Sequence, residues 1–260
     1  MITGFDHVVI AVRDLEAGVA AYETLLGRAV SARSESDGAA TALIATGNVA
    51  VELMALRGDG EAARRLRAAL KDGEGLKSLV FATDDIEAMH RRAERTALAP
   101  EPIADRDAWR SFRIDKDCAG GARLFFLQRD AALAPAQPHA DGVSALDHIV
   151  VRTPDPQRAV ALYGGRLGLD LRLDRDVGGR RLMFFRCGDT VLEVAHEPEL
   201  ERDTLWGLCW RVGDIDAAQA RLAAAGVNVS EVRIGMKPGT RVFTVRDRSC
   251  GVPTLMIGKA

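Results

Sequence analysis

The chain has 260 residues, with 35 basic against 37 acidic side chains, a formal net charge of −2 and 47% hydrophobic residues. This length allows one large domain or two smaller domains, each with a core that needs neither disulfides nor structural zinc. The near-neutral charge provides no basic face for phosphates, so neither nucleic acid nor an anionic membrane is expected as a partner.

The cysteines and the amino-terminal segment indicate the compartment. No Cys-x-x-Cys pair occurs among the four cysteines: Cys118, Cys187, Cys209 and Cys250. This spacing argues against a zinc knuckle and against a secreted disulfide framework. The first residues show no basic segment followed by an apolar one, and no apolar stretch reaches the roughly 18 residues of a membrane helix. We therefore expect a cytoplasmic protein.

The beginning of the chain predicts one strand, one helix and three further strands. An apolar run over residues 5–12 predicts the strand, and Asp14 is placed to cap a helix whose apolar stripe ends at Gly27. Three short β-like runs follow, around residues 29–34, 41–46 and 49–55. The pattern is a βαβββ unit, which is called a module below.

This module recurs 141 residues later in the chain. The segment over residues 6–9, Asp-His-Val-Val, reappears over residues 147–150 as Asp-His-Ile-Val. The same offset, without a gap, relates three further pairs: Tyr22 and Tyr163, Gly27 and Gly168, and Glu52 and Glu193. Matches that stay in register over such a span indicate an internal repeat.

A weaker repeat relates residues 78–86 to residues 207–215, and both segments lead into stretches that predict helices. Four modules therefore begin near residues 4, 75, 145 and 205. A proline-containing linker over residues 133–143 separates the second module from the third. We expect an N-terminal domain over residues 1–132 and a C-terminal domain over residues 144–260.

Three features together resemble the vicinal oxygen chelate (VOC) superfamily: the Asp-His-Val-Val strand, the helix ending Tyr-x-x-x-Leu-Gly, and the last strand with Val-Glu-Leu. That group includes glyoxalase I, methylmalonyl-CoA epimerase, bleomycin-binding proteins and extradiol dioxygenases. The resemblance implies an α+β fold of four βαβββ units, forming two glyoxalase-like VOC domains with open half-barrel sheets. It does not specify a reaction, because this fold hosts many chemistries.

The resemblance also implies a divalent metal held by the first and last strands of a module. Carried over to this sequence, the metal ligands are His7 and Glu52 in the first module and His148 and Glu193 in the third. Imidazole and carboxylate groups suit Zn²⁺, Ni²⁺, Co²⁺, Mn²⁺ or Fe²⁺. The matching positions in the other two modules offer no obvious ligand: Ser78, Phe125, Gly207 and Leu255.

The residues themselves leave the use of these pairs open. A buried carboxylate such as Glu52, between Val51 and Leu53, is costly unless it is paired or bound to a metal. A hydrogen bond between histidine and glutamate would satisfy both without a metal. If the first module pairs with the second, and the third with the fourth, each cleft has two ligands. A pairing of the first module with the third would complete a site of two histidines and two glutamates.

Three basic residues are candidates for substrate binding. Arg211 lies on the same side of its strand as Gly207, where it could hold a carboxylate or phosphate, although a strand-end arginine in solvent is the alternative. Lys237 and Arg241 flank a glycine-containing loop that could close over an anionic ligand.

The function expected from this sequence is that of a metal-dependent lyase or isomerase of the glyoxalase type. It would act on a small oxygen-rich substrate through an enolate, with Glu52 and Glu193 as catalytic bases. A non-catalytic small-molecule-binding protein of the bleomycin-resistance type is one alternative. An extradiol dioxygenase is another, although its ligands come from the last two modules, where this chain has Gly207 and Leu255. We expect a monomer or a homodimer.

Overall fold

The computed structural model describes residues 1–131, 133–134 and 141–260. By its internal contacts the chain divides into two units. Unit 1 comprises Met1–His7, Ser78–Leu133 and His148–Trp206, and unit 2 comprises Val8–Lys77, Ala134–Asp147 and Gly207–Ala260. Unit 1 thus holds the second and third modules, and unit 2 holds most of the first module and nearly all of the fourth. Most of the predicted linker 133–143 lies outside the described residues.

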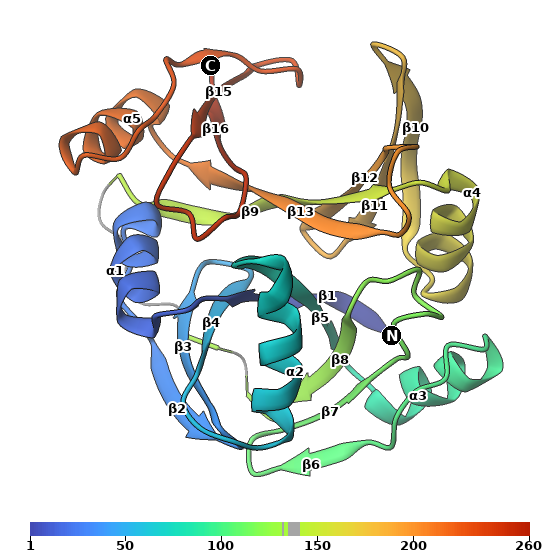
Figure 1. Ribbon diagram of the computed structural model, residues 1–260. Coiled ribbons are helices and arrows are strands. Elements are labelled where there is room, and N and C mark those ends of the chain that lie inside the picture. Colours follow the sequence, from blue (N-terminus) through green and yellow to red (C-terminus); the bar gives the residue numbers. More distant parts are fainter. Residues whose placement is uncertain (132, 135–140) are drawn as a thin grey trace. The chain divides into compact units, whose positions relative to one another are not determined.

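The first module has the predicted order of elements (Figure 1). They are β1 (Ile2–Ala11), α1 (Leu15–Leu26), β2 (Ala32–Ser36), β3 (Ala39–Ala45) and β4 (Ala50–Leu56). Asp14 caps α1 by accepting a hydrogen bond from the backbone N–H of Ala17 at 3.0 Å, and Gly27 ends the helix with φ 61°. Both helix boundaries are as predicted. A second helix, α2 (Glu61–Ala69), follows β4 and is extended by the 3-10 turn Leu70–Asp72.

The other three modules repeat this order. The second contains β5 (Gly75–Thr83), α3 (Ile86–Arg95), β6 (Ala104–Arg106), β7 (Trp109–Arg113) and β8 (Leu124–Arg129). The third contains β9 (Val143–Thr153), α4 (Pro156–Ala159) with the π-helical continuation Val160–Arg166, β10 (Asp170–Val177), β11 (Arg180–Cys187) and β12 (Thr190–His196). The fourth contains β13 (Thr204–Val212), α5 (Ile215–Ala224), β14 (Arg233–Ile234), β15 (Thr240–Val245) and β16 (Thr254–Lys259).

The strands form two eight-stranded sheets with the same topology. The first sheet has the order β2-β3-β4-β1-β5-β8-β7-β6, and the second has the order β10-β11-β12-β9-β13-β16-β15-β14. Each sheet therefore contains two modules, the first with the second and the third with the fourth. The first and last strands of the third module, β9 and β12, are adjacent and parallel. This adjacency brings residues near the two ends of a module together.

A helix covers one face of the sheet in each module. In the third module, Tyr163 packs on Phe185 of β11 with ring centres 5.8 Å apart, and α4 contacts β12. Leu192 and Val194 of β12 are fully buried between the helix and the sheet. Because side chains alternate along a strand, the intervening residues face away from the helix.

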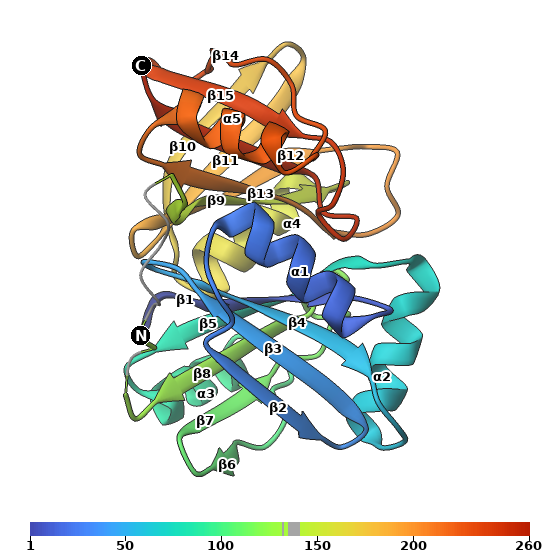
Figure 2. The same cartoon turned by 90° about the vertical axis from the view of Figure 1, so that its left-hand side faces the viewer.

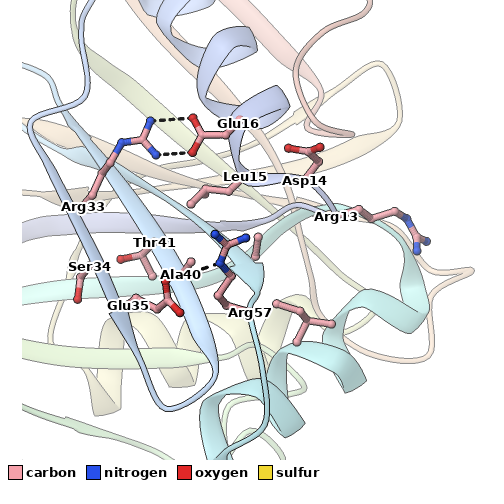
Figure 3. Close-up of a pocket in the computed structure, with 12 residues that line it drawn as sticks. Arg13, Asp14, Leu15, Glu16, Arg33, Ser34, Glu35, Ala40, Thr41 and Arg57 are labelled. Atoms are coloured by element: carbon pink, nitrogen blue, oxygen red, sulfur yellow. Dashed lines mark hydrogen bonds and ion pairs between the residues drawn. The ribbon is translucent and has the colours of Figure 1, made fainter.

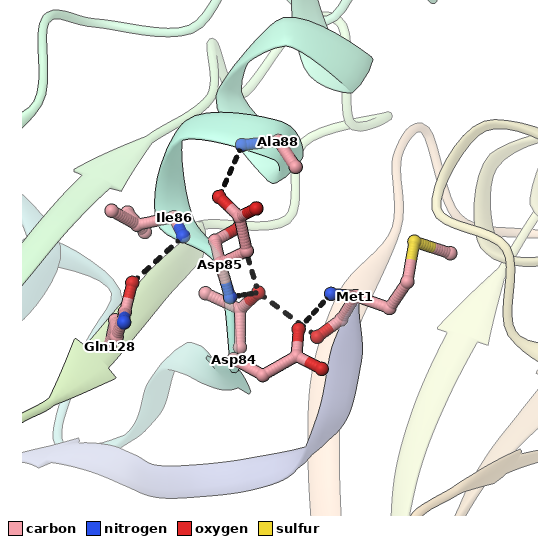
Figure 4. A network of polar contacts seen from close by, with 7 residues as sticks. Met1, Asp84, Asp85, Ile86, Ala88 and Gln128 are labelled. Carbon is pink, nitrogen blue, oxygen red and sulfur yellow. Dashed lines mark hydrogen bonds and ion pairs between the residues drawn. The ribbon is translucent and has the colours of Figure 1, made fainter.

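The start of the chain is anchored within unit 1 (Figure 4). The amino group of Met1 pairs with Asp84, and the hydroxyl of Thr83 donates to the carbonyl of Met1 at 3.0 Å. The backbone N–H of Ile86 donates to the side chain of Gln128 at 2.9 Å, which links α3 to β8. These contacts connect the first strand of the chain to the second module. No helix within the described ranges is long and apolar enough to cross a membrane.

Candidate functional site

The strand register of the third module places its candidate residues in rows on the face turned away from the helix. Glu193 of β12 lies opposite Val150 of β9 on one side and Phe184 of β11 on the other. His148 of β9 lies opposite Val191, in the neighbouring row. Since His148 and Val150 are two residues apart, as are Val191 and Glu193, all these side chains point to one face.

The structure brings His148 and Glu193 together. Nε2 of His148 lies 3.6 Å from Oε2 of Glu193, and the two side chains are only 20% and 19% exposed. Burial raises the pKa of Glu193, and the nearby charges of His148 and Arg175 oppose this shift without cancelling it. The pair is thus a partly desolvated carboxylate beside an imidazole.

This pair suits a divalent metal in donor type and in spacing. One imidazole nitrogen and one carboxylate oxygen are ligands that Zn²⁺, Mn²⁺, Ni²⁺, Co²⁺ and Fe²⁺ accept. Metal–ligand bonds of about 2.1 Å place two ligand atoms about 3.0 to 3.4 Å apart, depending on the coordination geometry. The observed 3.6 Å needs only a small shift of one side chain to reach that spacing.

In unit 1, a carboxylate also fixes the orientation of His7. Nδ1 of His7 lies 2.5 Å from Oδ1 of Asp6. The carboxylate of Asp6 also accepts two hydrogen bonds from Arg129, one from Nε to Oδ2 at 2.6 Å and one from Nη2 to Oδ1 at 2.8 Å. Burial alone would raise the pKa of Asp6, but the hydrogen bonds from His7 and Arg129 outweigh it and lower the pKa. A hydrogen bond from Nδ1–H to a carboxylate selects the tautomer with its lone pair on Nε2, as in many metal-binding histidines.

Glu52 is half-buried on β4, and the face that carries it is partly covered. Met54, two residues further along that strand, packs with Leu66 of α2 and with Leu70 just after it. Helix α2 was not predicted from the sequence, and it changes the surroundings expected for Glu52. In the described residues of the third module, the chain passes from β12 to β13 without a helix.

The three basic residues predicted to bind substrate lie in different places. Arg211 donates from Nε to Asp147 at 2.9 Å. Arg241 forms a two-pronged ion pair with Asp216 in the first turn of α5, at 2.5 and 2.9 Å, and so lies toward the helix rather than toward the opposite face. Lys237 is exposed in the turn before β15. Arg211 and Arg241 thus already have carboxylate partners in the chain.

Two arginines that were not among the predicted site residues share the face of Glu193. Arg152 lies four residues after His148 on β9, and Arg175 lies on β10 close enough to influence the pKa of Glu193. The alternation of side chains along β9 could have identified Arg152. Arg175 could not be placed before the register of the β10–β11 hairpin was known.

A separate cavity of about 510 Å³ lies in unit 2, beside the start of α1 (Figure 3). Two ion pairs lie among its charged lining residues. Arg33 donates to Glu16 at 2.6 Å, and Nε of Arg57 lies 3.7 Å from Glu35. None of the predicted site residues is among the residues that line this cavity, which we therefore do not assign to the candidate site.

Two sequence families match the chain. The family described as "Glyoxalase-like domain" matches residues 5–167, and the "Glyoxalase/Bleomycin resistance protein/Dioxygenase superfamily" matches residues 145–253. No curated protein matches the sequence. The two family matches and the two sheets confirm the predicted fold of tandem glyoxalase-like VOC domains.

Several solved structures have the same fold. A mutant of 4-hydroxymandelate synthase from Streptomyces coelicolor is 16% identical, with a TM-score of 0.76 over 100% of this chain and 93% of that one. The Mn(II)-bound glyoxalase from Novosphingobium aromaticivorans is 18% identical, with a TM-score of 0.73 over 99% and 82%. BphC, a halotolerant catechol dioxygenase, is 16% identical, with a TM-score of 0.70 over 99% and 87%.

These low identities establish a shared fold and leave the reaction unspecified. The match over residues 5–167 spans more than half of the sequence. With the second match over the remaining modules, it shows that the chain belongs to the glyoxalase-like domain family of the vicinal oxygen chelate superfamily.

Proposed function

We propose that this protein is a divalent-metal-dependent enzyme of the lyase or isomerase type, which moves a proton on a small oxygen-rich substrate through an enolate. The proposal is carried by the 3.6 Å contact between His148 and Glu193 on the sheet face turned away from the helix. In this proposal the third module is the principal site. His7 and Glu52 would serve the first module in the same way.

The residues of the third module have distinct roles in this reaction. Glu193 would leave the metal and take the proton, because a carboxylate acts as a base only through an oxygen that is not coordinated. His148 and Glu193 would hold the metal, which when bound supplies a positive charge that stabilises the enolate. Val150 and Phe184, the neighbours of Glu193 in its row, limit the access of water to the carboxylate.

A ring-cleaving dioxygenase is the second candidate function. The solved structures similar to this chain include a catechol dioxygenase and a catechol 2,3-dioxygenase. Against this candidate, the fourth module has Gly207 and Leu255 where we expected the ligands of such an enzyme. The metal-binding experiment below is therefore paired with an assay on catechol.

Metal retention tests the proposal directly. The full chain is stripped with EDTA, reloaded separately with Mn²⁺, Ni²⁺, Zn²⁺, Co²⁺ or Fe²⁺, and passed through a desalting column before its metal content is measured. We expect stoichiometric retention of at least one of these metals. His148→Ala and Glu193→Ala should each lower retention by about tenfold or more, as expected for the loss of one ligand of a metal site.

Two variants serve as matched controls. His196→Ala removes a histidine from the same strand as Glu193 but from its other face, and Glu199→Gln neutralises an exposed carboxylate just beyond that strand. Both should retain metal as the unaltered chain does. His7→Ala tests the first module separately.

The outcomes separate the candidate functions. Absence of retained metal, or retention unchanged by His148→Ala, contradicts the proposal and favours a metal-free binding protein. Cleavage of catechol by the Fe²⁺-loaded chain, with uptake of oxygen, favours the dioxygenase. Exchange of substrate protons with deuterated water, lost in Glu193→Gln, supports the proton-transfer role of Glu193.

A further inference from the structure

Each sheet and its two modules form one half of the chain, and an arginine from each half contacts a helix of the other half. Arg92 of α3 donates hydrogen bonds to the carbonyl groups of residues 165 and 166, from Nη2 at 3.0 Å and from Nε at 2.7 Å. Arg221 of α5 donates to the carbonyl groups of residues 24 and 25, from Nη1 at 2.5 Å and from Nη2 at 3.1 Å. The first contact lies within unit 1 and the second within unit 2. Both arginines thus bind near the end of a helix, where carbonyl groups lack a partner within the helix and favour a cation.

These two contacts correspond to one another in the internal repeat. The repeat between the second and fourth modules maps Arg92 onto Arg221, and the repeat between the first and third modules maps the acceptors of Arg221 onto those of Arg92. A β-carbon at Gly27, which follows the first helix, would lie 3.5 Å from the guanidinium carbon of Arg221. One at Gly168, the counterpart of Gly27, would lie 3.0 Å from Nη2 of Arg92. The same contact between an arginine and a helix end therefore occurs twice, once in each direction between the halves.

A second contact between the halves is also made twice. Gly47 lies in the turn between β3 and β4, and its backbone N–H donates to the carbonyl of Ser144 in β9 at 2.9 Å. A β-carbon at Gly47 would lie 2.6 Å from that carbonyl oxygen. Gly188, the counterpart of Gly47, lies in the turn between β11 and β12, where a β-carbon would lie 2.6 Å from the carbonyl oxygen of Thr3 in β1. Side chains do not tolerate so close an approach, so each turn needs a glycine beside the first strand of the other half.

A contact that occurs twice in opposite directions is typical of a symmetric dimer, because both subunits of such a dimer use the same surface. We propose that the two halves of this chain associate as the two subunits of a dimer do, each presenting the same surface to the other. The partner that this surface fits is a second half of the same kind, and the linker predicted over residues 133–143 is not what holds the halves together. This inference is independent of the proposed function, because its contacts involve neither His148 nor Glu193.

The alternative is a pair of domains that only the linker keeps close to each other, as in chains whose domains move independently. Hydrogen bonds from a guanidinium to main-chain carbonyl groups argue against this alternative, because they are charge-assisted and depend on a fixed geometry. Arg92 and Arg221 are both half-buried, so neither is a freely moving surface charge. The close approach of backbones at Gly47 and Gly188 likewise requires the two halves to meet in one defined position.

Cleavage of the linker in the full chain tests this inference. A protease recognition sequence is inserted into the predicted linker, the purified chain is cut, and both products are followed by size-exclusion chromatography and by sedimentation at decreasing concentrations. We expect the two halves to remain one complex at a concentration of about 1 μM, as subunits joined by a specific interface do. Domains that only the linker keeps together would separate into two smaller species.

Two arginine variants measure the contribution of the first contact. Arg92→Met and Arg221→Met keep an apolar stem and remove the charged donor, so each should raise the dissociation constant of the cut chain by about tenfold or more. Arg95→Met is the matched control, because Arg95 is the exposed last residue of the helix that carries Arg92. This control should leave the dissociation constant within about twofold, since a substitution at an exposed position has little effect.

A glycine variant tests the second contact without changing any charge. Gly47→Ala places a β-carbon against the carbonyl of Ser144 and should also raise the dissociation constant of the cut chain by about tenfold, the effect of an overpacked contact. Gly213→Ala is its control, because a β-carbon at Gly213 would meet no heavy atom within 4 Å. This pair carries the test if an arginine variant does not fold.

The outcomes are distinct from those of the metal experiment. The inference is overturned if the halves of the unaltered chain separate after cleavage. It is also overturned if Arg92→Met and Arg221→Met hold the cut chain together as tightly as Arg95→Met does. Because His148 and Glu193 lie in strands of the same sheet, metal retention is measured on the same cut sample. Halves that stay together without retaining metal would support the interface while contradicting the proposed enzyme.

Discussion

His148 and Glu193 lie 3.6 Å apart although 45 positions separate them in the chain. The contact exists because the first and last strands of the third module are adjacent and parallel, with Val191 opposite His148 and Glu193 opposite Val150. The carboxylate of Glu193 is partly withdrawn from water, and no hydrogen bond from the described residues replaces the hydration that it loses. Such a site is chemically useful and destabilising at once.

The first prediction concerns that destabilisation. We expect Glu193→Gln to raise the free energy of unfolding of the metal-stripped chain by about 1 kcal/mol, because glutamine has the same shape without the poorly hydrated charge. The measurement is urea unfolding at neutral pH in the presence of EDTA. Glu199→Gln, at an exposed position, should have no effect. A Glu193→Gln chain less stable than the unaltered one would mean that the His148 contact outweighs the burial of Glu193.

The second prediction concerns the ion pair behind His7. The carboxylate of Asp6 is 8% exposed and the side chain of Arg129 is 18% exposed, with their atoms 2.6 and 2.8 Å apart. Arg129→Met leaves this carboxylate buried and should lower the free energy of unfolding by about 3 kcal/mol. The double variant Asp6→Asn with Arg129→Met should recover part of the loss. Thermal unfolding of the unaltered chain and the two variants provides the comparison, and equal losses in the single and double variants would contradict the explanation.

The internal repeat explains how much of this fold could be predicted from the sequence. The repeat, the Asp14 cap and the Gly27 end are local signals, and all three match the structure. The facing of His148 and Glu193 toward one side also follows from alternation within a strand. Their closeness depends on which strands are neighbours. That long-range property came from the family resemblance rather than from any local pattern.

Other parts of the structure could not be predicted in this way. Helix α2 has apolar residues at helical spacing, at Ala63, Leu66 and Ala69, but the repeat that guided the assignment has no helix at the matching place. The position of Arg175 depends on the β10–β11 register, which shifts at an irregularity between Leu171 and Leu173. A single-residue shift moves every later side chain to the other face, so sequence alone could not decide which face Arg175 shares.

The third prediction is a pH dependence of stability that arises at Asp203. Its side chain is fully buried, accepts a hydrogen bond from Arg158 at 2.6 Å through Oδ1, and has no partner at Oδ2 among the described residues. Burial raises its pKa above the ordinary value of 3.8. At pH values between 3.8 and the raised pKa, Asp203 is therefore protonated more often in the folded chain than in the unfolded chain. Because the folded chain must give up this proton as the pH rises through that range, the contribution of Asp203 to the free energy of unfolding falls.

Asp203→Asn tests this dependence, because asparagine resembles the protonated carboxyl group at every pH. The variant and the unaltered chain should be about equally stable below the window, and the variant should become the more stable one as the pH rises through it. Urea unfolding at a series of pH values measures the difference, in which other titrating groups cancel. Asp107→Asn, at an exposed position, is the control. A difference that is constant or decreases with rising pH would contradict the assignment.

The fourth prediction uses a pair of tyrosines that the repeat makes directly comparable. Tyr22 and Tyr163 occupy equivalent helix positions and both are fully buried. The hydroxyl of Tyr22 donates to the carbonyl of Ser249 at 3.2 Å, whereas that of Tyr163 has no partner among the described residues. Replacement by phenylalanine removes a hydrogen bond at one position and a buried unsatisfied group at the other.

The two substitutions should therefore act in opposite directions. Tyr22→Phe should lower the free energy of unfolding by about 1 kcal/mol, because it leaves the carbonyl of Ser249 without its donor. Tyr163→Phe should raise it by up to about 1 kcal/mol, because the folded chain no longer buries a hydroxyl that water would satisfy. Each variant is the control for the other, since the substitution, the burial and the place in the module are the same. Equal shifts of the urea midpoint in one direction would contradict this explanation, because the Ser249 hydrogen bond would then make no difference between the two positions.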